Sequence, residues 1–181
     1  MNKINTAELT DEKIRSLKAG DTLLLSGVIY TARDAAHERM IKNYKDGFPF
    51  DIKGQVIYYA GPCPAKPGEV IGSCGPTTAG RMDAYTPLLL DSGLKVMIGK
   101  GVRSPEVTDA IKRNCCLYLG AIGGAGALIA KCIKKADVIA YEDLGTEAIR
   151  RLEVEDFPCT VLTDSYGNDI YEIGQRKYRE I

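Results

Sequence analysis

The chain has 181 residues, the size of one ordinary domain, and its hydrophobic fraction of 45% is enough to build a core and argues against disorder. Its 24 basic and 24 acidic side chains cancel, so the overall charge does not favour a nucleic acid or an anionic membrane as partner. No apolar run approaches the roughly 20 residues that span a bilayer. The opening segment MNKINTAELTDEKIRSL lacks an apolar signal core, so we expect a cytoplasmic protein.

A helix is expected over residues 8–17, with Thr10 as its N-cap. The β-rich run TLLLSGVIYTA at 22–32 predicts a strand with a bulge at Ser26-Gly27. Apolar residues at helical spacing in ARDAAHERMIKNY predict an amphipathic helix over 32–44. After it, GQVIYYAG predicts a short strand, and PCPAKPGEVIG predicts a Pro/Gly-rich loop that runs into a second short strand.

From residue 74 onward, strand and helix patterns follow one another closely. The segment CGPTTAGRMDAYTPLLLDSG predicts a loop that opens a helix, which ends at Gly93. The later elements, in chain order, are a strand at 95–101, a helix at 104–114 capped by Ser104, a strand, glycine-rich turn and helix within 116–136, a strand at 137–144, a charged helix at 146–156, a strand at 158–165, a turn at 166–169 and a short strand at 170–174. Residues 175–181 are expected to form a loosely ordered tail.

This order of elements predicts an α/β fold: a layered mixed sheet with some antiparallel pairing, covered by helices. No period of 20–50 residues repeats along the chain, which excludes a solenoid. No segment has the composition of a long linker, so residues 1–181 are predicted to form a single domain.

Six cysteines are spread along the chain, namely Cys63, Cys74, Cys115, Cys116, Cys132 and Cys159. They lack the C-x-x-C pairs of zinc ribbons and redox motifs, and the adjacent Cys115 and Cys116 are poorly placed for a disulfide. In a cytoplasmic protein this pattern predicts reduced, mostly buried thiols. The alternative is a zinc or iron–sulfur site held by this chain alone, which would need three or four converging ligands.

The loop CGPTTAGRMD holds the first candidate site residues. Gly75-Pro76 predicts a turn, and Thr77 or Thr78 then caps a helix whose free N–H groups favour an anion. Arg81 adds a guanidinium that can bind a carboxylate in two places. The alternative is an ordinary helix N-cap with a surface arginine, because Ser and Thr are common caps.

Two other patches carry candidate residues. Lys100 stands between two glycines at the end of a strand, where ligands gather in open α/β sheets; the alternative is a solvated lysine in a turn. Arg33 and His37 are four residues apart, so they share a helix face, and Asp34 lies beside Arg33. His37 is the single histidine, which excludes a His-rich metal site and favours a structural or exposed side chain.

A glycine-rich segment, LGAIGGAGALIA, follows a predicted strand and invites a dinucleotide interpretation. The spacing does not match, because no third glycine stands where the G-x-G-x-x-G fingerprint needs it. No phosphate-loop Lys-Ser/Thr pair is present either. The segment therefore predicts close packing through small residues, at the border of the site.

Taken together, six segments resemble one known family: TARDAAHERM, IYYAGPCPAKPGEVIGSCGPTTAGRMDAY, IGKGVRS, AIGGAGALIA, VIAYEDLGTEAIRRLEVEDFP and GNDIYE. They are similar to the β subunit of class I, iron–sulfur-dependent fumarate hydratase, which is also the C-terminal domain of single-chain class I fumarases. The β subunits of L-tartrate dehydratase are similar as well. The match runs over almost the whole chain.

The resemblance implies a swivelling β/β/α fold and a hydro-lyase that interconverts fumarate and L-malate. It implies a four-iron four-sulfur cluster bound by a partner α subunit, no metal ligand in this chain, and a heterodimer or heterotetramer. The residues that match the family's substrate-binding positions are Arg33, Thr77, Thr78, Arg81 and Lys100. Thr77 matches the proposed general base, and Lys100 is the second catalytic residue.

Two positions depart from the family pattern: Cys63 and Cys74 stand where small or Thr-like residues are expected. The nearest alternative function is the β subunit of L(+)-tartrate dehydratase, with the same architecture and chemistry. An alternative of another class is a dicarboxylate-binding regulatory module without catalysis.

Overall fold

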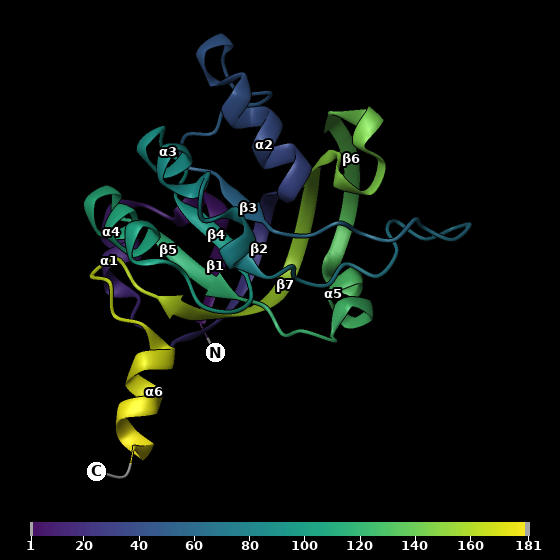
Figure 1. Ribbon diagram of the computed structural model, residues 1–181. Coiled ribbons are helices and arrows are strands. Elements are labelled where there is room, and N and C mark those ends of the chain that lie inside the picture. The colour runs from purple at the N-terminus through teal and green to yellow at the C-terminus, as the bar shows by residue number, and fades with distance from the viewer. Residues whose placement is uncertain (1, 180–181) are drawn as a thin grey trace.

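The computed structural model describes residues 2–179, and its centre is a seven-stranded sheet (Figure 1). The strand order is β1-β2-β3-β4-β5-β7-β6. A further pairing of β2 with β7 closes five strands, β2, β3, β4, β5 and β7, into a barrel. The strands are β1 (Asn2–Asn5), β2 (Thr22–Thr31), β3 (Val56–Tyr58), β4 (Val96–Gly99), β5 (Leu117–Gly120), β6 (Ile133–Ala140) and β7 (Ile149–Thr163).

The pairs β1–β2, β2–β3, β3–β4 and β4–β5 are parallel, whereas β7 runs antiparallel to β2, β5 and β6. The carboxyl ends of β2 to β5 therefore lie at one edge, where open α/β sheets place their ligands. The α-helices are α1 (Asp11–Ser16), α2 (Asp34–Lys42), α3 (Thr86–Asp91), α4 (Pro105–Asn114), α5 (Gly126–Cys132) and α6 (Ile170–Tyr178). Four 3₁₀ helices join them: η1 (Thr6–Glu8), η2 (Tyr44–Asp46), η3 (Ala79–Met82) and η4 (Glu142–Glu147).

Two layers of buried side chains explain why β3, β4 and β5 are continuous apolar runs. Alternate residues of each strand, such as Val56, Val96 and Leu117, point into the barrel and form one core. Their neighbours Ile57 and Met97 point outward and form a second core with α2, α3 and α4. Parallel strands that are buried on both faces lose the polar alternation of a half-exposed strand. The predicted α/β architecture, a mixed sheet covered by helices, is confirmed.

Two predicted N-caps and the predicted bulge in β2 are present in the structure. Thr10 caps α1 by accepting a hydrogen bond from the N–H of Lys13 at 3.2 Å. Ser104 caps α4, accepting from Val107 at 3.4 Å. The bulge in β2 is present, because the register with β7 shifts between Leu25 and Gly27, where the glycine adopts φ 115°.

The prediction of a charged helix at 146–156 was wrong, because most of this segment belongs to β7. Its buried residues Ile149, Leu152, Val154 and Phe157 are spaced by three, two and three positions, which resembles a helical period. The strand alternation is broken by register shifts against β6 and β2, and by Asp156, whose φ is 51°. Pairing with β2 on one side and β6 on the other outweighs the helix propensity of the charged residues.

Two smaller expectations also failed. The strand predicted at 170–174 is the start of α6, capped by Asp169, which accepts a hydrogen bond from the N–H of Tyr171 at 2.7 Å. An apolar run this short cannot be assigned to strand or helix by its period alone. The second short strand expected at the end of the Pro/Gly-rich loop is absent: residues 59–77 form an irregular arm that extends from the sheet (Figure 1).

The C-terminal helix α6 projects away from the sheet (Figure 1). It extends through Tyr178, so residues 175–178 of the expected tail are helical, and residues 180–181 lie outside the described part of the chain. None of the helices in residues 2–179 has both the length and the apolar composition to cross a membrane.

Candidate active site

The predicted site residues come together at the carboxyl ends of β2, β3 and β4. Arg33 follows β2 and Lys100 follows β4, while the loop that carries Thr77 passes beside the end of β3. This is the edge at which the parallel strands were expected to place a ligand. The tertiary structure thus brings together three segments separated by more than 20 residues each.

Backbone hydrogen bonds hold Thr77 and Lys100 side by side. The N–H of Thr77 donates to Tyr59 at 2.7 Å, and the Thr77 carbonyl accepts from the N–H of Lys100 at 3.3 Å. The Lys100 carbonyl in turn accepts from Ala79 at 2.8 Å, which forms a parallel bridge between Thr78 and Lys100. Thr78 makes no side-chain capping bond to η3, so the pure N-cap interpretation of this loop does not hold for Thr78.

The glycine-rich segment supports the other end of the loop. The N–H of Cys74 donates to the Gly126 carbonyl at 3.1 Å, and the buried hydroxyl of Tyr58 donates to the Cys74 carbonyl at 2.7 Å. A Cβ at Gly126 would lie 2.9 Å from the Gly75 nitrogen, closer than real Cβ atoms approach. The predicted close packing through small residues is confirmed, and the backbone it packs against belongs to the CGPTTAGRMD loop.

Asp34 binds both candidate arginines. Its Oδ1 atom lies 2.8 Å from Nε of Arg81, and its Oδ2 atom lies 3.2 Å from Nε of Arg33. Glu147 adds a second carboxylate 3.4 Å from Nε of Arg33. These contacts are made through Nε, so the terminal nitrogens Nη1 and Nη2 of both arginines remain available. Within residues 2–179 these terminal nitrogens donate no hydrogen bond. Each guanidinium can thus still bind a carboxylate.

The carboxyl group of Asp34 is ionised by this environment. Partial burial raises its pKa, but hydrogen bonds from its own backbone N–H and from Arg33, together with the charges of Arg81 and Arg33, outweigh burial and bring the pKa below its ordinary value. The negative charge partly neutralises two guanidinium groups that would otherwise repel each other.

Gly61 leaves room for the Arg33 side chain, and Gly123 lies at ordinary contact distance from Lys100. A Cβ at Gly61 would lie 2.9 Å from Cδ of Arg33, so the arginine side chain lies directly over the Gly61 backbone. A Cβ at Gly123 would lie 3.7 Å from Nζ of Lys100. Lys100 is exposed, and its ammonium group makes no ion pair within the described residues. The hydroxyls of Thr77 and Thr78 likewise make no hydrogen bond there.

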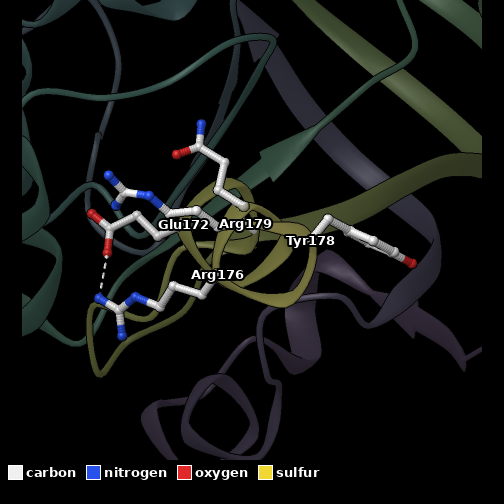
Figure 2. A pocket seen from close by; sticks show the side chains of 5 residues that line it. Glu172, Arg176, Tyr178 and Arg179 are labelled. Atoms are coloured by element: carbon white, nitrogen blue, oxygen red, sulfur yellow. Dashed lines mark hydrogen bonds and ion pairs between the residues drawn. The ribbon is translucent and has the colours of Figure 1, made fainter. Parts of the chain in front are cut away.

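A hollow of about 430 Å³ opens beside Lys100. It is lined by Lys100 and by residues of β5, the glycine-rich turn, β7 and the start of α6, namely Gly120, Ala121, Ile122, Gly123, Thr160, Leu162, Ile170 and Tyr171. A larger hollow of about 740 Å³ lies along α6 and is lined by Glu172, Gln175, Arg176, Tyr178 and Arg179 (Figure 2). All of these residues belong to the C-terminal end of one chain segment, so no second element converges on that hollow, and we assign it no site.

His37 does not belong to the reactive surface. Its side chain is fully buried, and Nδ1 lies 3.0 Å from the Arg33 carbonyl, which can only accept, so Nδ1 carries the proton. Burial lowers its pKa to about 4, against the opposing effect of that hydrogen bond, and the charge of Arg103 lowers it further. The structural interpretation of the lone histidine is therefore the right one: it ties the first turn of α2 to Arg33.

The cysteines do not fit an iron–sulfur cluster held by this chain. Within residues 2–179 there is no group of three or more His, Cys, Asp or Glu residues arranged to hold a metal ion. Burial raises the pKa of Cys74, Cys116 and Cys159 to about 12, so these thiols are protonated and poor ligands. Cys63 is exposed on the arm.

Three residues that support the site escaped the sequence analysis. Glu147 was hidden because its segment was interpreted as a helix, whereas it precedes β7 and also accepts the N–H of Ala35 at 2.7 Å. Gly61 carried a signal, since a glycine before proline often marks a tight backbone approach. Arg103 stood in the quoted motif IGKGVRS without an assigned role, and its side chain is fully buried beneath the site.

The fold and the candidate site define an α/β domain with the cationic side chains of Arg33, Arg81 and Lys100 near its strand ends. The chain belongs to the fumarase C-terminus family, whose profile matches residues 1–174. It is 47% identical over 156 residues to the aerobic class I fumarate hydratase of Salmonella typhimurium, which covers 83% of this chain and 27% of that protein. It is 42% identical over 164 residues to fumarate hydratase 2 of Leishmania major, covering 88% and 29%.

A shorter relative matches from end to end. The Methanocaldococcus jannaschii chain named "Putative L(+)-tartrate dehydratase subunit beta" is 38% identical over 181 residues, covering 96% of this chain and 93% of that one. In contrast, the chain spans less than a third of the length of the two hydratases. The chain thus corresponds to part of the two hydratases and to nearly all of the chain named a tartrate dehydratase β subunit.

Proposed function

We propose that this chain is the β subunit of a two-subunit iron–sulfur hydro-lyase that reversibly hydrates fumarate to L-malate. The observation that carries the proposal is the pairing of Arg33 and Arg81 through Asp34, which leaves their terminal nitrogens open at the strand edge that also carries the Thr78–Lys100 bridge. The identities of 42–47% to fumarate hydratases support the choice of substrate.

The three cations suit a small dicarboxylate. Arg33 and Arg81 each offer a planar fork of donors that binds one carboxylate in two places, and Lys100 adds a mobile point charge. Thr78, exposed beside Lys100, offers a hydroxyl to the same ligand. Two carboxylates held at fixed positions would orient the carbon atoms between them, which is how binding energy assists a reaction at the substrate's centre.

Thr77 is the proposed base at the carbon that loses its proton when malate is dehydrated. A threonine alkoxide is costly in water, so Thr77 needs a nearby cation and a dry site to accept that proton. Lys100, whose backbone is bonded to that of Thr77, is the proposed source of that positive charge. Thr77 is partly exposed in the isolated chain, so the dry environment would come from a partner that covers the loop.

In this proposal, a partner α subunit that binds the four-iron four-sulfur cluster acts on the hydroxyl group that leaves the substrate. Two observations support this division. The cysteines of this chain are dispersed, and four of the six are buried. The chain matches only 27% and 29% of the length of the two hydratase relatives, so most of their sequence has no counterpart here. A heterodimer or heterotetramer in the cytoplasm is the assembly we propose.

A second candidate substrate is L(+)-tartrate. The match to the Methanocaldococcus jannaschii chain favours it, because the matched region covers 96% of this chain and 93% of that relative. Tartrate carries one more hydroxyl on the same dicarboxylate frame, so the cations described above serve either ligand. The test is turnover of L-malate against L-tartrate by the complex assembled with its α subunit; preference for tartrate would replace the proposed substrate.

The central experiment is anaerobic co-expression with the α subunit and an assay of fumarate hydration, with Thr77→Ala, Arg81→Ala and Lys100→Ala alongside. We expect each substitution to lower kcat/KM by about 10²-fold or more, the range for a positioned acid–base or electrostatic group. Near-normal kcat/KM in all three would refute the site assignment. Dicarboxylate binding by a complex without turnover would instead support a regulatory module.

A further inference from the structure

Arg103 is a cation buried beneath the candidate site. Its side chain has no exposed surface, and its Nε donates to Oδ1 of Asp83 at 2.7 Å. Its Nη2 donates to the hydroxyl of Thr86 at 2.7 Å, and its Nη1 to that of Tyr59 at 3.3 Å. The guanidinium also lies over the ring of Tyr118, 4.9 Å from its centre. Because it is enclosed on all sides, Arg103 cannot contact a ligand.

Asp83 is bound at both oxygens by the chain segment that follows Lys100. Its Oδ1 accepts from Arg103, and its Oδ2 accepts the backbone N–H of Ser104 at 2.7 Å. Asp83 lies two residues after Arg81, and Arg103 lies three residues after Lys100. The ion pair therefore joins the two loops that carry the candidate site residues.

The other links between these loops are weak by comparison. They are the two backbone bonds of the Thr78–Lys100 bridge, one of them 3.3 Å long; Thr78 and Lys100 are exposed, whereas Ala79, which donates the other bond, is buried. An exposed bridge of two bonds opens easily. The charged hydrogen bond from the fully buried Arg103 to Asp83, whose side chain is 16% exposed, holds its geometry more firmly.

We propose that the Arg103–Asp83 ion pair is the positioning element that sets where Arg81 and Thr77 stand relative to Lys100. Burying two charges costs almost as much as their attraction returns, so such a pair adds little to stability and is better suited to selecting one geometry. Burial lowers the pKa of Arg103, but Tyr59 and Asp83 outweigh it, and the guanidinium stays charged. The kinetic part of the test below rests on the proposed function, and the exchange part does not.

The first measurement is amide hydrogen exchange on the full chain, comparing the wild type with Asp83→Asn and Arg103→Lys. Asp83→Asn keeps the shape and removes the charge; Arg103→Lys keeps the charge and removes the fork. We expect exchange at the Ala79 and Lys100 amides to rise by about tenfold or more. The amide of Tyr59, which donates to Ile98 in the adjacent strand at 2.8 Å, should stay unchanged.

The second measurement is kcat and KM of the assembled complex for its dicarboxylate. We expect both variants to lower kcat/KM by about 10²-fold, through KM as well as kcat, since a small displacement of the cations affects binding and reaction together. Asp91→Asn is the matched control: it breaks the exposed Arg113–Asp91 pair, which is bidentate at 2.8 and 2.7 Å and joins α3 to α4 away from the loops. Val107→Ala controls for lost stability, because Val107 is buried in the same layer. Both controls should stay within about twofold of the wild type in kcat/KM.

Two results would overturn the proposal. One is a kcat/KM for Asp83→Asn within twofold of the wild type; the other is faster exchange of Ala79 to the same extent in Val107→Ala. If the wild-type complex hydrated no dicarboxylate but the two loop amides still exchanged faster in both variants, the proposed function would fail, and the ion pair would still be shown to position the loops.

Discussion

Arg81 and Asp34 form an ion pair in which Nε of the arginine lies 2.8 Å from Oδ1 of the carboxylate, although 47 residues separate them in the chain. The contact joins the first turn of α2 to the loop after the arm, and it aims the free end of the guanidinium away from its partner. The same carboxylate also pairs with Arg33. One acidic side chain thus organises two of the three cations of the half-site.

Replacing Asp34 by Asn separates orientation from charge. The substitution keeps the shape and removes one negative charge from between the two arginines. We expect kcat/KM for the dicarboxylate to fall by about 10²-fold because the forks lose their alignment, whereas inhibition by inorganic sulfate becomes stronger because the site gains positive charge. The measurement is steady-state kinetics of the assembled complex with and without sulfate.

The control for that substitution removes a different ion pair of the same helix, between Arg39 of α2 and Asp143 of η4. Asp143→Asn breaks the bidentate pair with Arg39, at 2.7 Å for both bonds, on the exposed side of α2. Kinetics of this variant should match the wild type. A drop in kcat/KM for Asp143→Asn equal to that for Asp34→Asn would mean that any loosening of α2 has this effect, and that Asp34 has no specific role.

His37 predicts a pH dependence of folding. Its pKa is about 4 in the folded chain and about 6.5 when exposed, so the unfolded state binds an extra proton between these values. Stability is fully present above about pH 6.5 and falls as the pH drops toward 4, by at most about 3.5 kcal/mol, since each of the roughly 2.5 pKa units corresponds to about 1.4 kcal/mol. Urea unfolding at pH 7 and pH 4.5 measures the loss.

Urea unfolding of His37→Gln at the same two pH values tests whether His37 causes this loss of stability. The amide retains a donor for the Arg33 carbonyl and removes the titrating group. The difference in free energy of unfolding between pH 7 and pH 4.5 should shrink by most of the His37 contribution. An unchanged difference would assign the slope to the carboxylates instead.

The packing of Gly126 against Gly75 predicts a localised sensitivity to a methyl group. In Gly126→Ala the new Cβ would lie 2.5 Å from Oγ of Ser73 and 2.9 Å from the Gly75 nitrogen, so the site loop must move. We expect a loss of about 1–3 kcal/mol in the free energy of unfolding, as for overpacked interiors, and lower kcat/KM. Thermal melts and kinetics measure the two effects.

Gly174→Ala is the matched control, because a Cβ there meets nothing within 4 Å and the residue lies in α6. This variant should gain up to about 1 kcal/mol, the usual difference between Ala and Gly in a helix. If both glycine variants behaved alike, the close contact with the loop would have no energetic consequence.

The cysteines predict a graded reactivity. Cys63 is exposed, whereas Cys74, Cys116 and Cys159 are buried, and burial raises the pKa of each of these three to about 12. Iodoacetamide should therefore label Cys63 first in the native chain and reach the three buried thiols only after unfolding. Mass spectrometry of labelled peptides over time measures the order. Rapid native labelling of Cys116 would show that the core between α3 and β5 is open.

The sequence by itself determined the class of fold and the location of the cations. Short apolar β-rich runs, N-caps at Thr10 and Ser104 and the glycine at the β2 bulge depend on local preferences, which act over a few residues and can be seen in the pattern. The strand-end rule indicated Lys100 as a candidate ligand residue, and the family resemblance grouped it with Arg33, which the structure places after the neighbouring end of β2.

Only the tertiary structure decided which distant groups meet. β7 is a strand because β2 and β6 pair with it on either side, and that non-local pairing outweighs a helical propensity and an interrupted alternation. The double pairing of Asp34 and the burial of Arg103 against Asp83 depend on loops folding back over a closed sheet. Such contacts have no signature in sequence spacing, because their energy comes from charges brought together by the packing of other parts of the chain.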